Sequence, residues 1–368
     1  MYMKMIGMLL FMLLPLVAVV YVSWHLWTLL PLNSLWKTVV VAVAVGCFLL
    51  LFADMSGSLD RLSLPLARVL YTIGTSSVVI MLYLVILFLV LDLGRLTHVV
   101  PSRLLTNSWT TTVAVVVLMT AVFVYGNLHY RHKVRQPLSF TSTKALKKDY
   151  RFVMASDLHL GYHNPRTELA RWVDLMNAEH ADAILIAGDI VDISVRPLLE
   201  EDMAKEFRRL NAPVYACLGN HEYYSGEPDA QRFYYDAGIR LLQDETAVID
   251  NTIVVAGRDD RTNRRRKSMA ELLGNTSRDN YIIVLDHQPY HLEESEQNGV
   301  DLQLSGHTHH GQVWPISWIT EALYECAFGQ HQRGNTHYYV SSGLGIWGGK
   351  FRIGTRSEYA VITLSHQP

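Results

Sequence analysis

The sequence predicts an α/β protein in which a helical membrane anchor precedes a domain of alternating strands and helices. Residues 1–126 form long apolar segments with few charges, whereas short apolar strands alternate with helical stretches from Tyr150 onward. The whole chain is 50% hydrophobic and 18% charged, a balance shifted towards membrane proteins. We therefore expect a transmembrane anchor at 1–126, a basic linker at 127–149 and a second domain at 150–368.

Four apolar segments make up the expected anchor, at residues 6–30, 36–53, 69–91 and 109–125. A membrane helix needs about 20 apolar residues, and tryptophans near the segment ends are typical of the membrane interface. The first segment is too long for a cleaved signal peptide and three more follow it. Few ionisable residues interrupt the segments, which favours a plain anchor over a transport path.

Basic residues predict the orientation of the anchor. On the side of the first and third loops, the basic residues at or near the segment ends are only Lys37, Arg95 and Arg103, whereas the opposite side holds Lys4, Arg61, Arg68 and a basic cluster at 131–151. Positive residues accumulate on the cytoplasmic side, so we expect both termini there, at the inner (cytoplasmic) membrane. The three scattered cysteines form no CxxC motif and fit a reducing compartment. A net charge of −2 gives no support for nucleic-acid binding.

The second domain alternates predicted strands and helices. Strands are expected at 151–156, 183–187, 214–218, 252–256, 281–285, 302–304, 338–341 and 359–364. Helices are expected at 165–179, with a proline near the start, and at 197–210.

Polar motifs follow several of these strands. They are Asp157-Leu158-His159, Gly188-Asp189, Gly219-Asn220-His221-Glu222, His287 and Gly306-His307-Thr308-His309. If the segments are extended, the side chains of residues i and i+2 point to the same side, so the two side chains of each Asp-x-His or His-x-His motif can bind the same ion. The ligand candidates are more than one tetrahedral zinc uses, which indicates two divalent ions. Mixed imidazole and carboxylate ligands suit Mn²⁺, Fe²⁺ or Zn²⁺ better than Mg²⁺ or Ca²⁺, and of these we expect Mn²⁺.

This donor set predicts a metal-dependent phosphohydrolase. Two divalent ions, offset by Asp157, Asp189 and one hydroxide, leave a positive charge that favours a phosphate and its transition state. The hydroxide held by both ions is the expected nucleophile. His221 follows the ligand candidate Asn220 and is placed to protonate the leaving oxygen.

The ordered motifs resemble those of the calcineurin-like metallophosphoesterase superfamily, across residues 150–310. The resemblance implies a β-sandwich flanked by helices, with Asp189 bridging two metals and His221 as acid or transition-state stabiliser. One metal would be held by Asp157, His159 and His309, and the other by Asn220, His287 and His307. Asp286 stands where the family commonly has glycine, serine or threonine; it would either orient His287 or be solvated.

The tail is similar to membrane-associated phosphoesterases of the YkuE and YaeI type, through 311–313, 339–345, Arg352, Arg356 and Glu358. Some relatives hydrolyse UDP-2,3-diacylglucosamine to UMP and an acylated sugar phosphate. Arg352 and Arg356 are candidate substrate-binding phosphate clamps, with surface arginines as the alternative.

Three further features have two interpretations each. Residues 313–328, with Trp314 and Trp318, are either packed core or an acyl-chain or membrane lip at the site entrance. The basic run 261–267 is either a solvated loop or a contact for phospholipid or an anionic substrate. His163 and His310 lie close to motif residues and either reach the pocket or serve no metal role.

The sequence as a whole predicts a membrane-anchored dinuclear phosphoesterase. Its expected substrate is a phosphoester or pyrophosphate of a lipid such as UDP-2,3-diacylglucosamine, which places it in lipid metabolism. The alternatives are a phosphodiesterase acting on phospholipid, isoprenoid phosphate or cyclic nucleotide, and a non-catalytic membrane scaffold. The expected partners are the lipid substrate and the membrane, with no nucleic acid.

Overall fold

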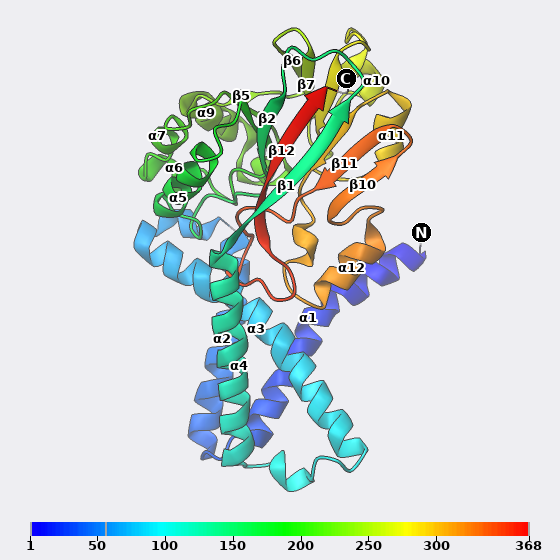
Figure 1. The fold of residues 1–368 in the computed structure, drawn as a ribbon. Helices are drawn as coiled ribbons and strands as arrows, with labels where there is room; N and C mark the ends of the chain where they lie inside the picture. The colour runs from blue at the N-terminus through cyan, green and yellow to red at the C-terminus, as the bar shows by residue number, and fades with distance from the viewer. Residues whose placement is uncertain (1, 56, 367–368) are drawn as a thin grey trace. The chain divides into compact units, whose positions relative to one another are not determined.

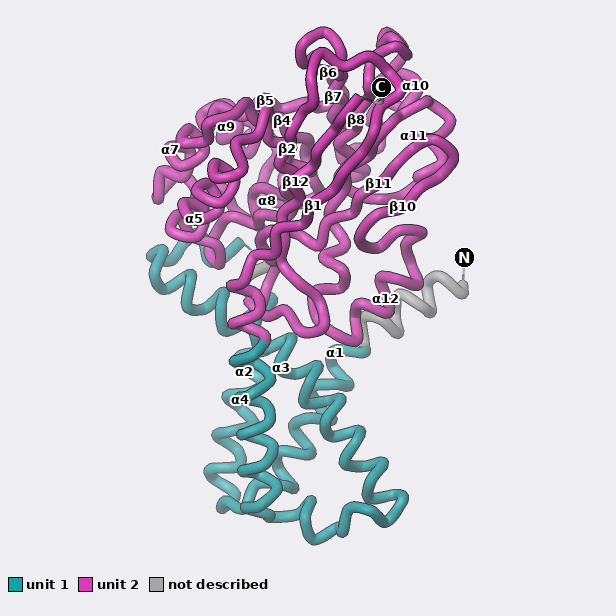
Figure 2. Tube along the Cα trace, viewed as in Figure 1, with its two compact units in different colours: residues 1–125 teal, residues 126–368 magenta. Residues whose placement is uncertain are grey.

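The computed structural model describes residues 2–55 and 57–366, and the side chains among them except those of 2–13 and 53–55 (Figure 1). Lys4, used above for the orientation, therefore lies outside the described side chains. The chain divides into unit 1, residues 1–125, and unit 2, residues 126–368 (Figure 2).

Unit 1 consists mainly of long apolar helices. They are α1 (Tyr2–Leu29), α2 (Ser34–Met55), α3 (Leu64–Leu96) and α4 (Trp109–Arg131), whose last turn lies in unit 2. In the described part of the chain, three stretches are long and apolar enough to cross a membrane: Ser34–Phe52, Leu64–Leu96 and Trp109–Arg131. The stretch of α1 that is described side chain by side chain, Leu14–Leu29, is apolar but shorter. The apolar helices are thus confirmed, and a fourth span stays a prediction.

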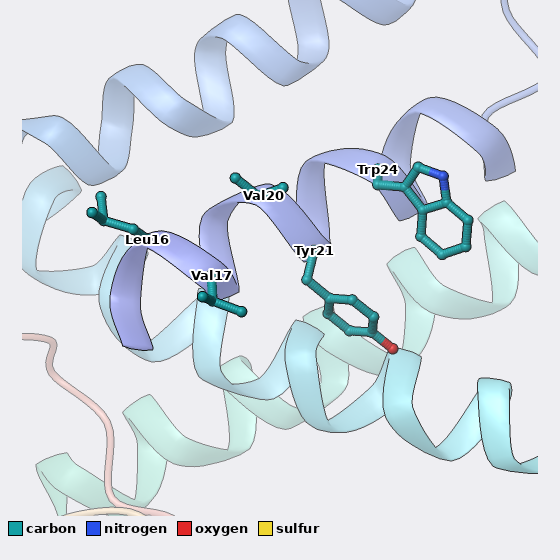
Figure 3. A pocket seen from close by; sticks show the side chains of 5 residues that line it. All are labelled: Leu16, Val17, Val20, Tyr21 and Trp24. Carbon is teal, nitrogen blue, oxygen red and sulfur yellow. The ribbon is translucent and has the colours of Figure 1, made fainter. Parts of the chain in front are cut away.

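Polar and apolar surfaces both occur on α1. Asp92 of α3 accepts a hydrogen bond from Tyr21 Oη at 2.8 Å and lies 3.0 Å from Nε2 of His25. A groove of about 450 Å³ is lined by residues of α1 alone: Leu16, Val17, Val20, Tyr21 and Trp24 (Figure 3). Because one helix supplies every lining residue, the groove is the apolar flank of that helix, as expected for a surface facing lipid.

Unit 2 contains two sheets of six strands each. The first has the order β1 (Lys133–Ser142), β12 (Ser357–His366), β2 (Tyr150–Ala155), β3 (Ala183–Ala187), β4 (Val214–Cys217), β5 (Arg240–Leu241). The second has the order β10 (Gly329–Arg333), β11 (Thr336–Val340), β9 (Leu302–Ser305), β8 (Tyr281–Leu285), β7 (Ile253–Gly257), β6 (Glu245–Ile249). Strands β2 to β5 run parallel, as do β7, β8, β9 and β11, which confirms the α/β class.

The core lies between the two sheets and beneath the helices. Phe152 and Leu185 of the first sheet pack with Ile283 and Leu304 of the second. Alternate residues of the first sheet, such as Ile184, face the helices α5 (Arg166–Asn177) and α9 (Glu227–Ala237) instead. On the second sheet, Val284 packs with α10 (Met269–Leu273). Burial on both faces explains why the parallel strands are continuous apolar runs.

Some elements differ from the sequence-based expectation. Strand β1 lies inside the segment expected to be a basic linker, and pairs in parallel with β12. Its buried Leu138 and Phe140 alternate with exposed residues, a pattern obscured by the basic residues around it. The helix expected at 197–210 is two short helices, α6 (Arg196–Glu200) and α7 (Ala204–Phe207), separated by Asp202 at φ 53°. Strands β5, β6 and β10 were not predicted.

Candidate metal centre

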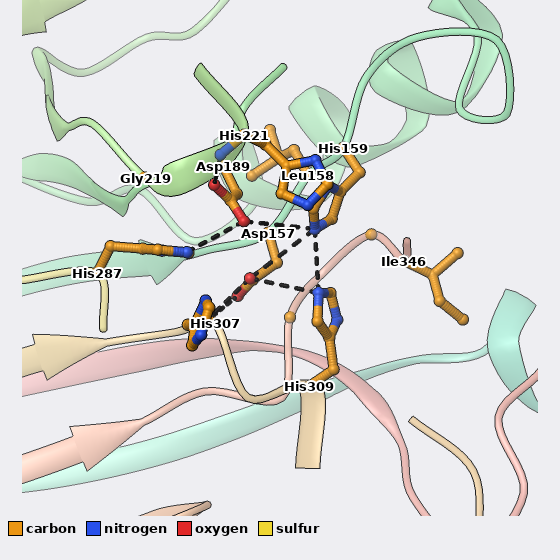
Figure 4. A network of polar contacts seen from close by, with 12 residues as sticks. Asp157, Leu158, His159, Asp189, Gly219, His221, His287, His307, His309 and Ile346 are labelled. Atoms are coloured by element: carbon orange, nitrogen blue, oxygen red, sulfur yellow. Dashed lines mark hydrogen bonds and ion pairs between the residues drawn. The ribbon is translucent and has the colours of Figure 1, made fainter. Parts of the chain in front are cut away.

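The motif residues lie at the carboxyl ends of parallel strands from both sheets. Asp157 and His159 follow β2, Asp189 follows β3, and Asn220 begins the helix α8 (Asn220–Ser225) after β4. In the second sheet, His287 follows β8, and His307 and His309 follow β9. Figure 4 shows that the labelled aspartates and histidines of this set converge on one region, and Oδ1 of Asn220 lies 2.8 Å from Nδ1 of His307. The structure therefore brings together every residue proposed as a metal ligand from the sequence.

The backbone at these positions is left-handed rather than extended. The φ angles are 53° at Asp157, 44° at His159, 54° at Asp189, 71° at His307 and 48° at His309. The side chains of residues i and i+2 do converge, but the expected cause, an extended backbone, was wrong. Tight turns after the strands aim the side chains inward, and such strained conformations concentrate at functional sites.

Two motif glycines make room for the carboxylates. A Cβ atom at Gly219 would overlap Oδ1 of Asp189, and one at Gly306 would overlap Oδ2 of Asp157. The absence of a side chain at these two positions is what lets the loops approach so closely.

The first group of ligand candidates is formed by Asp157, His159 and His309. The Nε2 atoms of the two histidines lie 3.0 Å apart, and Nε2 of His309 lies 3.4 Å from Oδ1 of Asp157. Burial, and then the nearby His159, lower the pKa of His309 well below its usual value, so this imidazole is a neutral base. Its nitrogen lone pair is thus available to a cation.

The second group is formed by Asp189, His287 and His307. Nε2 of His287 lies 3.0 Å from Oδ2 of Asp189, and its Nδ1 lies 2.7 Å from the carbonyl oxygen of Ala187. Burial opposes a charge on His287, but the Asp189 carboxylate outweighs it and raises the pKa of His287 well above its usual value. A divalent cation between these two atoms would take the place of the proton held there.

Asn220 joins this second group through His307. Nδ1 of His307 lies 2.8 Å from Oδ1 of Asn220. Burial, and then the neighbouring His287, lower the pKa of His307 to about 4. In one tautomer of the neutral imidazole Nδ1–H donates to the amide oxygen; in the other, Nδ1 and Oδ1 are two electron-pair donors that a shared metal ion would satisfy.

The donor set as a whole fits two divalent ions. Asp189 belongs both to the group with His287 and His307 and to a third group with His159 and His221, so it connects the two sides. In each group the ligand atoms lie within 4.8 Å of one another. Buried imidazole and carboxylate donors suit Mn, Fe or Zn rather than the oxygen-preferring Ca²⁺ and Mg²⁺. The individual ligand assignments stay predictions.

His221, the predicted proton donor, lies beside this centre. Its backbone N–H donates to Oδ1 of Asp189 at 2.9 Å, and its Nδ1 lies 3.3 Å from Oδ1 of Asp192. Burial works against a charged imidazole, but the carboxylates of Asp189 and Asp192 raise the pKa of His221 to about 9. The side chain retains 12% exposure, so a substrate can reach it.

Two buried carboxylates of the site had no role assigned to them from the sequence. Asp192 is 0% exposed and lies between two imidazoles, 3.4 Å from Nδ1 of His159 and 3.3 Å from Nδ1 of His221. Glu222 accepts hydrogen bonds from the backbone N–H groups of Gly219 at 2.7 Å, Val191 at 2.9 Å and Asp189 at 3.2 Å. The available signals were an acid three residues after Asp189 and the glutamate that ends the Gly-Asn-His-Glu motif.

The arginines proposed as phosphate clamps have other contacts. Arg352 is 0% exposed and donates to the carbonyl oxygen of His309 at 2.7 Å and to those of Ser342 and Gly345. Arg356 donates to Glu358 at 2.7 Å and to Gln136 at 2.7 Å. The clamp interpretation is thus not supported for Arg352, since its guanidinium braces backbone and faces no solvent.

Asp286 takes neither role foreseen for it. Asp286 is buried; its Oδ2 lies 3.3 Å from Nη1 of Arg258, and its Oδ1 lies 3.2 Å from Nη1 of Arg266. Arg266 belongs to the basic run 261–267. These ion pairs fix the loop after β7 against the loop that carries His287.

The two accessory histidines lie outside the three ligand groups. His310 contacts Glu321 at 2.8 Å and stacks on Phe328, so it faces away from the metal centre. His163 is buried, and burial lowers its pKa to about 3, which keeps its imidazole neutral.

Comparisons with known proteins identify the family of the domain that carries these residues. The calcineurin-like phosphoesterase family model matches residues 150–311. An uncharacterized metallophosphoesterase of Aquifex aeolicus is 32% identical over 59% of this chain and 85% of its own length. A transmembrane protein with metallophosphoesterase domain from Danio rerio is 30% identical over 58% of this chain and 53% of its own. The 5'-nucleotidase precursor of Thermus thermophilus aligns with a TM-score of 0.36 and 15% identity, over 53% of this chain and 50% of that one, too weakly to support an argument.

Proposed function

The chain belongs to the calcineurin-like metallophosphoesterase family, and we propose that it hydrolyses a phosphoester or pyrophosphate bond of a lipid at a membrane surface. The observation that carries the phosphoesterase activity is the pair of buried donor groups joined by Asp189. The complete donor set argues against a non-catalytic scaffold.

The residues divide the work of hydrolysis between them. Asp157, His159 and His309 would hold one divalent ion, and Asn220, His287 and His307 the other, with Asp189 shared. The bound ions would supply Lewis-acid stabilisation of the phosphate and activation of a water nucleophile. Manganese is our proposed metal.

Proton transfer falls to His221. Asp192 holds its Nδ1 side, so Nε2 is the nitrogen free to donate a proton to the leaving oxygen. Glu222 holds the loops after β3 and β4 together through three backbone N–H groups, which keeps His221 beside Asp189.

An exposed apolar helix next to the site supports a lipid substrate. Helix α12 (Ile316–Leu323) begins soon after His309, and its Trp318, Ile319 and Leu323 are 62%, 56% and 69% exposed. The packed-core interpretation of this segment is therefore wrong for these residues. A short amphipathic helix with an exposed tryptophan is typical of a membrane interface.

Hydrogen bonds connect α12 to the last turn of α4. Trp314, just before α12, donates its backbone N–H to the carbonyl oxygen of Ile353 at 2.7 Å. Ile353 packs against Gly126, and the neighbouring Arg352 donates its N–H to the Gly126 carbonyl oxygen at 3.0 Å. If α4 spans the membrane, the exposed apolar face of α12 lies near its exit point, where lipid headgroups would be found.

A line of aromatic contacts suggests where an anionic substrate group binds. The ring of Tyr324 lies 6.3 Å from that of His307, and its hydroxyl lies 2.9 Å from that of Tyr290. The guanidinium of Arg261 lies 4.1 Å from the Tyr290 ring. Arg261 therefore replaces Arg352 as our candidate for a phosphate contact in the substrate.

We propose UDP-2,3-diacylglucosamine as the leading substrate, with isoprenoid phosphates and phospholipids next. Both termini and unit 2 would lie on the cytoplasmic side of the inner membrane. This placement rests on the distribution of basic residues in the sequence.

One reaction tests the proposal. The full chain in detergent is incubated with Mn²⁺, UDP-2,3-diacylglucosamine and bis(p-nitrophenyl) phosphate, and the products are identified by mass spectrometry. Formation of UMP and the acylated sugar phosphate, lost in Asp189→Ala and Asn220→Ala, is the expected result. Cleavage of the soluble diester alone would overturn this lipid assignment, and cleavage of neither by the metal-loaded protein would overturn the enzymatic activity.

A further inference from the structure

Tyr130, in the last turn of α4, contacts the loop that presents the first ligand candidates. It is 1% exposed, and its hydroxyl lies 2.9 Å from Oδ1 of Asn164 and 2.7 Å from Oε2 of Glu168. The hydroxyl carries one proton, so it donates to one of these two oxygens at a time.

Asn164 in turn binds the backbone of the loop that carries His159. It is 0% exposed, and its Nδ2 donates to the carbonyl oxygens of Leu158 at 3.0 Å, His159 at 2.9 Å and Ile346 at 3.2 Å. Because His159 has a left-handed φ of 44°, its loop depends on such tertiary contacts to hold its conformation.

A second set of contacts runs from the same turn to His309. The carbonyl oxygen of Gly126 accepts the backbone N–H of Arg352 at 3.0 Å. The buried guanidinium of Arg352 then donates to the carbonyl oxygen of His309 at 2.7 Å. The turn is thus linked to both histidines whose Nε2 atoms lie 3.0 Å apart.

Charged contacts fix the turn in place. Lys133 donates to the carbonyl oxygen of Tyr130 at 2.9 Å, and Lys350 forms an ion pair with Glu168. Asn127 donates to the carbonyl oxygen of Lys350 at 3.0 Å. The last turn of α4 is therefore an integral part of unit 2.

We propose that Tyr130 is a positioning residue, which holds the loop of His159 at the spacing that a dinuclear centre requires. This inference rests on the proposed metal-dependent function and extends it to the membrane anchor. The helix α4 then serves both as a membrane anchor and as one wall of the catalytic unit.

Metal binding by the full chain in detergent tests the inference without any substrate. Tyr130→Phe removes one buried hydroxyl; Tyr338→Phe is the matched control. Tyr338 is likewise 1% exposed, and its hydroxyl donates to the carbonyl oxygen of Leu292 at 2.7 Å. The readouts are Mn²⁺ binding by calorimetry, the paramagnetic resonance signal of coupled Mn²⁺ pairs, and the melting temperature.

We expect Tyr130→Phe to weaken binding of one Mn²⁺ about tenfold or more and to reduce the coupled-pair signal. Tyr338→Phe should lower the melting temperature comparably and leave both Mn²⁺ readouts at the wild-type level. A second variant, Arg352→Lys, keeps the charge but loses the two-pronged contact with His309 and Gly345, and should act in the same direction.

Wild-type Mn²⁺ affinity and signal in Tyr130→Phe would overturn the inference. If Tyr130→Phe fails to fold, Asn164→Asp, which loses the Nδ2 donor to the carbonyl oxygens of Leu158 and His159, takes its place, and wild-type Mn²⁺ affinity and signal in that variant would overturn the inference. Failure of the proposed function is a separate outcome, because it would appear as a wild-type protein that binds two Mn²⁺ ions but cleaves no phosphoester.

Discussion

His159 and His309 approach with their Nε2 atoms 3.0 Å apart, although 150 positions separate them in the sequence. Asp192 faces Nδ1 of His159 at 3.4 Å and favours the proton on that nitrogen, which leaves a lone pair on Nε2. The neutral His309 likewise has a lone pair to offer. Two such nitrogens face one another without repulsion when a proton or a cation lies between them, and together with Asp157 they would hold a divalent ion.

Metal binding should therefore stabilise the folded protein. We expect the melting temperature of the chelator-treated chain to rise with added Mn²⁺, because a ligand that binds only the folded state adds about 2.7 kcal/mol at a hundredfold excess over its Kd. His309→Ala should bind one Mn²⁺ fewer than the wild type. The control is His310→Ala, whose imidazole contacts Glu321 instead. A melting temperature independent of Mn²⁺ would contradict the prediction.

Asp192 should matter for turnover more than for substrate binding. Asp192→Asn removes the negative charge shared by His159 and His221, and we expect kcat on a soluble phosphodiester to fall about 10- to 100-fold with KM little changed. Steady-state kinetics of the metal-saturated full chain measure both constants. The exposed Asp229 provides a matched Asp→Asn control with wild-type rates. A change confined to KM would instead assign Asp192 to substrate binding.

The sequence predicted the parallel strands and the ligand candidates because both are local patterns. Runs such as residues 183–187 and 281–285 are buried on both faces, and their boundaries match β3 and β8. Asp192 was missed, and Glu222 was assigned no role, because their partners are imidazoles and backbone N–H groups that only the fold brings near. Arg352 was misread for the same reason, since burial cannot be read from one arginine in a polar loop.

The exposed face of α12 should be needed for lipid substrates alone. Trp318→Asp places a charge where we propose contact with lipid, so kcat/KM for a lipid substrate in vesicles should fall about tenfold, ~1.4 kcal/mol. The rate on bis(p-nitrophenyl) phosphate should be unchanged. Tyr235→Asp on α9, where the side chain is 84% exposed, is the matched control and should affect neither substrate. An equal loss of activity on both substrates would contradict a role of α12 in contact with lipid.

The ion pair between Arg135 and Glu179 should make stability depend on acid pH. Arg135 donates from Nε and Nη2 to the two oxygens of Glu179, at 2.8 Å each, and so ties β1 to the end of α5. The hydrogen bond from Arg135 lowers the pKa of Glu179 below its ordinary value of 4.5. Because the folded pKa is the lower one, this stabilisation is complete above about pH 4.5 and is lost as the pH falls through the folded pKa.

Glu179→Gln should therefore cost about 1–2 kcal/mol of unfolding free energy at pH 7, a value reduced by the partial exposure of Arg135. The difference from the wild type should shrink as the pH is lowered below 4.5, because protonation of Glu179 removes the same charge. Urea denaturation of the full chain in detergent, monitored by tryptophan fluorescence at several pH values, measures this difference in unfolding free energy. Glu200→Gln removes the exposed pair with Arg196 and should change stability little at any pH. A difference for Glu179→Gln that stays constant down to pH 3 would show that the charge of Glu179 contributes nothing.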